Sequence, residues 1–64
     1  MIKTEYLGKK LKITDIDGRV WHGKVAMLMP ASQSDSGESE LYIEFGGGLT
    51  EFKESEIKEI EEEK

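Results

Sequence analysis

The chain contains no cysteine and only one proline among its 64 residues. Without cysteine, neither a disulfide nor a thiolate metal site can reinforce the fold. A domain of this size buries only about 60% of the surface that its unfolded chain exposes, so modest stability is expected. Association with further copies of the chain is the remaining reinforcement, and we therefore expect a homo-oligomer.

Long apolar runs are absent as well. The first ten residues carry charges at Lys3, Glu5, Lys9 and Lys10, a pattern unlike that of a signal peptide or a membrane anchor. The chain is also too short for a second core, so we expect one domain over residues 1–64. The expected location is cytoplasmic, with no membrane partner.

The sequence offers no set of residues for catalysis or for metal binding. His22 is the only histidine, and one imidazole alone makes neither a metal cluster nor a nucleophile–base pair. The segment 15–18 lacks the later ligands of a calcium loop, and the three glycines at 46–48 do not open a helix as in a phosphate-binding loop. We expect no catalytic residue, no metal, no cofactor and no enzyme activity, hence a protein that acts by binding.

Charge is distributed unevenly along the chain. Residues 1–30 carry six basic and three acidic side chains, whereas residues 31–64 carry three basic and eleven acidic ones, for a net charge of −5. The acidic half opposes general binding to nucleic-acid backbones, since such binding relies on Lys and Arg to neutralise phosphates. A basic patch in the first half is compatible with the same count, although lysines that alternate along a strand also form an ordinary solvated face.

Alternating apolar residues predict an all-β fold. Leu11 and Ile13 alternate with lysines, and Leu41, Ile43 and Phe45 alternate with polar residues, the period of a half-buried strand. We expect a short N-terminal helical turn, a polar flexible loop at 30–39, an acidic tail at 61–64, and five strands at 9–14, 19–29, 40–45, 49–53 and about 57–61. A helix that begins at Ser55 is the alternative for residues 55–64.

The second strand is expected to be long and bent. Trp21, Gly23, Val25, Met27 and Met29 fall on one side by alternation. A glycine on an inward face is typical of a sharp bend or a close approach of another strand. Trp21 is expected in the core, because large aromatic side chains dominate burial in small domains.

The segment from Gly8 to Val25 resembles the first motif of the Sm-like family. It holds an apolar strand, an Asp17-Gly18 turn and the run Trp21-His22-Gly23-Lys24-Val25, and a closing Ile57-x-x-Ile60-Glu61 lies near the end of the chain. This resemblance implies a strongly bent five-stranded barrel. It also implies rings, in which the fourth strand of one subunit pairs with the fifth strand of the next, and RNA binding. Small barrels of the Src-homology-3 kind share much of this pattern.

The family's RNA-contacting residues do not carry over to this chain. Its Asp-x-aromatic-x-Asn signature is replaced by residues 27–30 (Met-Leu-Met-Pro), and its second-motif Arg-Gly is missing from residues 52–55. We therefore expect a self-assembling binding module whose contacts with RNA or another nucleic acid come from the first hairpin, through Lys10, Lys12, Lys24 and His22. The alternative is a protein-interaction domain of the Src-homology-3-like kind, which would bind a protein partner through Tyr6, Tyr42 and His22.

Overall fold

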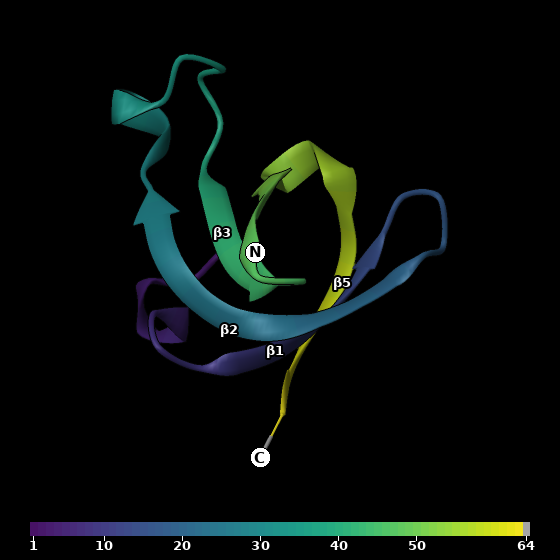
Figure 1. Cartoon of the computed structure of the whole chain (residues 1–64). Coiled ribbons are helices and arrows are strands. Elements are labelled where there is room, and N and C mark those ends of the chain that lie inside the picture. Colours follow the sequence, from purple (N-terminus) through teal and green to yellow (C-terminus); the bar gives the residue numbers. More distant parts are fainter. Residues whose placement is uncertain (64) are drawn as a thin grey trace.

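The computed structural model describes residues 1–63, whose regular structure consists of strands and short 3-10 turns. Figure 1 shows β2 as one long arc along which the other strands are arranged. The five strands are β1 (Lys10–Asp15), β2 (Val20–Met29), β3 (Glu40–Phe45), β4 (Gly48–Lys53) and β5 (Ile57–Glu63), and the 3-10 turns are η1 (Thr4–Tyr6), η2 (Ala31–Gln33) and η3 (Glu54–Glu56). The all-β class, the short N-terminal helical turn and the five strands predicted from the sequence are confirmed.

All strand pairs are antiparallel and follow the order β4-β3-β2-β1-β5. The first half of β2, residues 20–24, pairs with β1, and the second half, residues 25–29, pairs with β3. One strand thus belongs to both halves of the sheet. β4 and β5 are the two ends of the strand order, and within residues 1–63 no pairing between them closes the sheet.

The turn between β1 and β2 is held by Asp15. Its Oδ1 accepts hydrogen bonds of 2.9 Å from the backbone N–H groups of Asp17 and Arg19. Gly18 follows with φ +85°, a conformation that residues with a Cβ rarely adopt. The aspartate and the glycine together close the predicted hairpin, which aligns the two strands in register.

β3 comes very close to β2 at Gly23. A Cβ at this position would be 2.5 Å from the backbone oxygen of Glu44 and 3.1 Å from the Cβ of Ile43, so only glycine allows β3 to approach this closely. The pairing register then shifts between Val25 and Met27. This bulge reverses the alternation, which explains why the inward position expected for Met27 is wrong: its side chain is 39% exposed.

The C-terminal segment is a strand and not a helix. After η3, β5 pairs with β1 from Ile57 to Glu63. The prediction of a separate acidic tail at 61–64 is therefore wrong for residues 61–63, because hydrogen bonding to β1 continues through them. Lys64 lies outside the described residues.

Residues 30–39 contain no strand, but they are tied to the rest of the molecule. The carboxylate of Glu38 accepts hydrogen bonds from the Ser55 N–H (2.8 Å) and the Ser55 Oγ (3.1 Å), and the Glu54 N–H donates to the Ser39 carbonyl (3.0 Å). The loop thereby reaches η3, which follows β4 in the chain.

Every strand contributes to one core of buried apolar side chains. Ile2 and Tyr6 of the N-terminal segment pack against this core, and Trp21 does so while remaining half-buried. The buried set is Leu11, Ile13, Val25, Leu41, Ile43, Phe52 and Ile57. Outside this core, polar and charged residues share the exposed positions of the strands with apolar residues such as Val20, Met27 and Leu49.

Candidate functional site

The structure brings together the four residues predicted to contact nucleic acid. In the β1–β2 ladder Lys10 lies directly opposite Lys24, and Lys12 lies directly opposite His22. Directly opposed residues project from the same side of a sheet, and the neighbouring Leu11 and Ile13 are buried on the other side. Lys10, Lys12, His22 and Lys24 therefore form one outward patch, called the basic face below.

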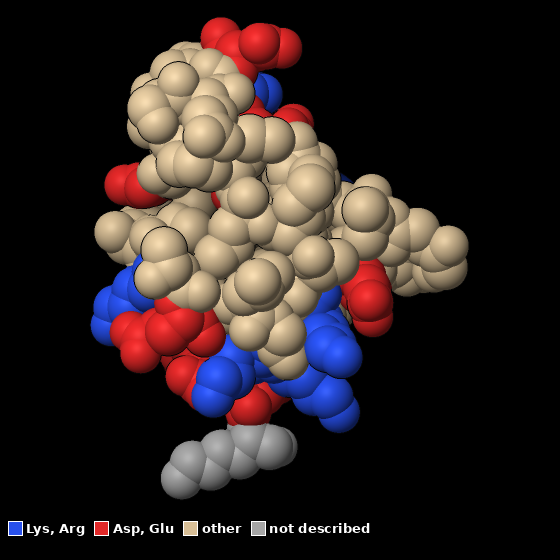
Figure 2. Space-filling model, turned by 90° about the vertical axis from the view of Figure 1, so that its left-hand side faces the viewer, with Lys and Arg blue, Asp and Glu red and all other residues tan. Residues whose placement is uncertain are grey.

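Acidic residues of β5 border this basic face. Glu63 lies opposite Lys10 and Glu61 lies opposite Lys12 in the β1–β5 ladder. The Oε2 of Glu63 is 3.0 Å from the Nδ1 of His22, a residue that lies one strand further on. Figure 2 shows charges of both signs side by side at the lower end of the molecule, below a largely uncharged surface. The patch is thus mixed in charge, which the sequence positions alone did not suggest.

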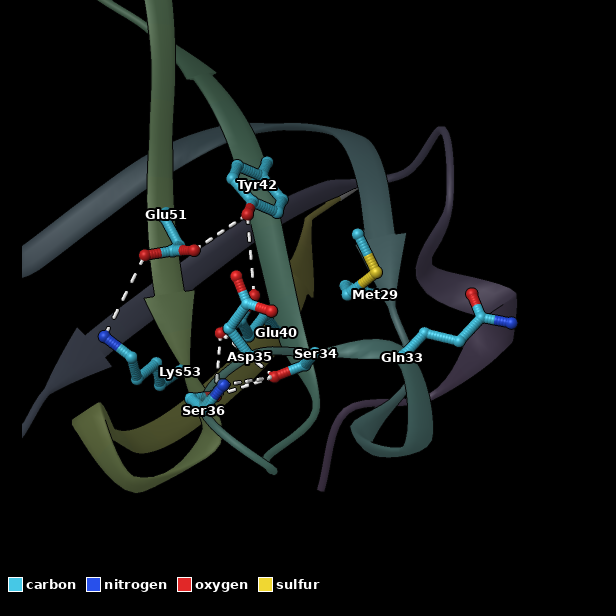
Figure 3. Close-up of a pocket in the computed structure, with 9 residues that line it drawn as sticks. All are labelled: Met29, Gln33, Ser34, Asp35, Ser36, Glu40, Tyr42, Glu51 and Lys53. Atoms are coloured by element: carbon cyan, nitrogen blue, oxygen red, sulfur yellow. Dashed lines mark hydrogen bonds and ion pairs between the residues drawn. The ribbon is translucent and has the colours of Figure 1, made fainter.

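A second candidate site is a hollow of about 470 Å³ between the 30–39 loop and the outward side of β2, β3 and β4. Figure 3 shows polar side chains from the loop and from the strands pointing toward one another in it. We call it the loop hollow. Its lining residues are Met29, Gln33, Ser34, Asp35, Ser36, Glu40, Tyr42, Glu51 and Lys53.

Glu40 is the buried acid of the loop hollow, with only 5% of its surface exposed. Its Oε2 accepts hydrogen bonds from the Oγ of Ser36 (2.8 Å) and from the Oγ of Ser34 (3.3 Å). The bond from Ser36 is the main reason that the pKa of Glu40 lies below its ordinary value, since it stabilises the charged carboxylate more than burial disfavours it. The serines of the loop therefore keep a buried negative charge in place.

Tyr42 stands between the two carboxylates of the loop hollow. Its hydroxyl donates a hydrogen bond of 2.7 Å to the Oε2 of Glu51 and lies 3.5 Å from the Oε1 of Glu40. The bond to Glu51 is the largest cause, ahead of burial, of a rise in the Tyr42 pKa to about 12. Lys53 Nζ is 4.0 Å from the other oxygen of Glu51. Tyr42 is thus held as a hydrogen-bond donor.

The two tyrosines predicted to bind a protein partner are less exposed than that prediction supposed. Tyr6 is half-buried, packs against the core and does not line the loop hollow. Tyr42 is also half-buried, and its hydroxyl already donates a hydrogen bond to Glu51. Of the pair, only Tyr42 lies in a recess where a ligand could reach it.

Sequence reasoning did not single out Glu40, Glu51 and the loop serines. Alternation along β3 places Glu40 and Tyr42 on one side, and the sequence alone is enough to predict this. The partnership with Ser34 and Ser36 depends on how the loop folds back, which no local pattern encodes.

Within residues 1–63, no group of three or more His, Asp or Glu side chains is arranged to hold a metal ion. None of the helical turns in the described part of the chain has the length and apolar character needed to cross a membrane. No protein family, curated protein or solved structure matches this chain.

Proposed function

We propose that this chain is an Sm-like small barrel that assembles with copies of itself and binds nucleic acid through the basic face. The observation that carries the nucleic-acid part is the pairing of Lys10 with Lys24 and of Lys12 with His22 on one outward surface. Ammonium groups spaced along a surface neutralise successive phosphates, and this term supplies most of the affinity of non-specific binding.

The strand arrangement supports the Sm-like part of the proposal. The resemblance of residues 8–25 implies a strongly bent barrel. In support of this, β2 is shared between both halves of the sheet, and β3 approaches it closely at Gly23. In the proposed barrel, the β4 and β5 ends of the strand order approach each other around the core.

Two exposed edges support self-assembly. β4 and β5 each have one neighbour within the chain, so each keeps a row of backbone donors and acceptors that another strand can pair with. The proposed contact joins β4 of one subunit to β5 of the next. This contact would also reinforce a core of only seven buried apolar residues.

The mass in solution tests the assembly. Six or seven copies of a 7.3 kDa chain would give a species of about 44 or 51 kDa by size exclusion with light scattering, as expected for a closed ring. A monomer or a dimer at all concentrations would refute the ring.

Binding of a labelled single-stranded RNA, followed by fluorescence anisotropy at increasing salt, tests the nucleic-acid part. Three phosphate contacts predict a slope of about −2 for log affinity against log salt, at about −0.7 per contact. The variant Lys10→Ala/Lys24→Ala should bind weakly and with a shallower slope. Lys3→Ala/Lys58→Ala removes the same charge from exposed positions outside the basic face and should bind like the wild type. Equal effects of both variants would refute the assigned surface.

The loop hollow favours one alternative, a protein-interaction domain that receives a partner's side chain beside Tyr42. Its volume of about 470 Å³ and its lining of polar groups around an aromatic ring suit such a contact. Three results together would establish this alternative in place of the first. The protein would be monomeric and would fail to bind RNA even at low salt, and it would capture one protein partner that the Tyr42→Ala variant no longer binds.

A further inference from the structure

The outward side of β5 carries a column of carboxylates that runs beside the basic face. Glu59, Glu61 and Glu63 lie directly opposite Thr14, Lys12 and Lys10 of β1, so all three project from the same side of the sheet as the lysines. We call these three residues the acidic column. It occupies the side of β1 that faces away from β2.

Carboxylates near the end of β5 contact one basic residue on β2 and another that directly precedes β1. Glu63 reaches across β1 to His22 on β2, where its Oε2 lies 3.0 Å from Nδ1. The neighbouring Glu62 places its Oε1 3.4 Å from the Nζ of Lys9. The end of the strand is therefore joined by charge contacts to the segment that presents the lysines.

The charges of the two groups cancel. The three lysines of the basic face contribute three positive charges and the acidic column contributes three negative ones when His22 is neutral. Lys10 and Lys12 each lie directly opposite a carboxylate of the neighbouring strand. Adjacent strands lie about 4.8 Å apart, which is within the distance of about 10 Å over which charges act in moderate salt. A polyanion that approaches this surface meets almost no net attraction while the carboxylates stay on it.

The hold of the acidic column is weak enough to be reversed. Glu61, Glu62 and Glu63 are all exposed, and ion pairs between exposed groups contribute little because water and salt screen them. The apolar anchors of β5, Ile57 and Ile60, both lie before this part of the strand. The side chains of Glu61 and Glu63 can therefore move away from the lysines without disturbing the core.

From this arrangement we propose that the acidic column is a built-in competitor for the basic face. Its carboxylates lie beside the lysines, with Glu63 in contact with His22, and a nucleic acid binds by displacing them from the surface. This inference rests on the proposed nucleic-acid binding and adds its regulation: the chain binds weakly unless the strand end is neutralised or drawn away, for example by a basic partner.

Glutamine substitutions test the competition without shortening the strand. Glu61→Gln/Glu63→Gln keeps the size of both side chains and removes two charges beside the lysines. Glu5→Gln/Glu44→Gln makes the same change in net charge at exposed positions on η1 and β3. Affinity for the labelled single-stranded RNA is measured for both variants and for the wild type at low salt, after circular dichroism has confirmed that each protein is folded.

The competitor model predicts that Glu61→Gln/Glu63→Gln binds about fivefold more tightly than the wild type. This is the size expected when the exposed Glu63–His22 contact and the charge of Glu61 opposite Lys12 no longer compete. The Glu5→Gln/Glu44→Gln control should gain much less. If the wild type binds and both variants gain equally, or neither gains, the competitor role is refuted while the proposed function stands. If none of the three proteins binds, the proposed function is refuted and the competitor role with it.

Discussion

The indole Nε1–H of Trp21 donates a 2.9 Å hydrogen bond to the Oδ2 of Asp15. The same indole packs edge-to-face against Phe45 and Phe52, with ring centroids 5.0 and 5.5 Å apart. Since the other oxygen of Asp15 holds the β1–β2 turn, one carboxylate links the turn to the aromatic cluster. Trp21 is therefore anchored at its polar end as well as by packing.

Asp15→Asn should destabilise the protein at neutral pH and make its stability less sensitive to acid. The Trp21 bond is the main cause that lowers the pKa of Asp15 below its ordinary value of 3.8. A lowered folded-state pKa gives stability above pH 3.8 that is lost as the pH falls through the folded value. The difference in thermal midpoint between wild type and variant, followed by Trp21 fluorescence, should thus be largest near neutrality and shrink in acid.

The matched control is Asp17→Asn, an exposed position in the same turn, which should leave the midpoint nearly unchanged. A gap between wild type and Asp15→Asn that stays constant from neutral pH into strong acid would contradict the role given to the carboxylate.

Gly23→Ala should destabilise the fold by about 1–3 kcal/mol, the usual cost of forcing an extra carbon into a packed site. The new Cβ would lie 2.5 Å from the Glu44 backbone oxygen, and backbone in a paired strand yields little. Gly48→Ala is the control, because a Cβ there meets nothing within 4 Å. Urea unfolding should separate the two variants, and equal midpoints would show that β2 and β3 are not in close approach at Gly23.

Local pattern predicted much of the fold. The bounds of β3 follow from the alternation of Leu41, Ile43 and Phe45, and the Asp15–Gly18 turn follows from the chemistry of its two end residues. What the pattern missed arises from pairing. The bulge after Val25 turns Met27 outward. Pairing with β1 extends β5 through residues 61–63, whose composition had predicted a charged tail.

The same distinction applies to the candidate sites. The basic face was predictable, since alternation and a hairpin suffice to place Lys10, Lys12, His22 and Lys24 together. The acidic column was not, because its position depends on which strand becomes the neighbour of β1. Glu40 was missed for a similar reason: a strand-end glutamate is usually exposed, and only the folded loop supplies the serines that allow it to be buried.

Ser36→Ala should raise the pKa of Glu40. The Ser36 hydroxyl is the largest cause of the lowered value, and its loss leaves a buried carboxylate with fewer donors. Because a depressed carboxyl pKa stabilises the fold above the ordinary value of 4.5, the variant should lose stability at neutral pH and differ less from the wild type in acid. Glu40 titration by carboxyl-detected NMR measures the pKa directly.

Ser32→Ala serves as the control for the loop, since Ser32 is exposed in η2 and the change removes the same hydroxyl. Its Glu40 titration should match that of the wild type. An unchanged Glu40 pKa in Ser36→Ala would show that the Ser36 contact is not formed in solution.

Glu51→Gln should lower the pKa of Tyr42 from about 12 toward its ordinary value of 10.0, because the Glu51 carboxylate is the main group that opposes ionisation of the hydroxyl. A raised tyrosine pKa stabilises the fold below pH 10.0, and this stability is lost as the pH rises toward 12. The wild type should therefore lose more stability over that pH interval than the variant does.

Tyrosinate absorbance in a Tyr6→Phe background isolates the titration of Tyr42. The control is Glu44→Gln, which removes an exposed carboxylate from β3, the strand of Tyr42. This variant should leave the Tyr42 pKa close to the wild-type value. An ordinary Tyr42 titration in the folded wild type would refute the hydrogen bond to Glu51, and with it the view that Tyr42 is held as a donor in the loop hollow.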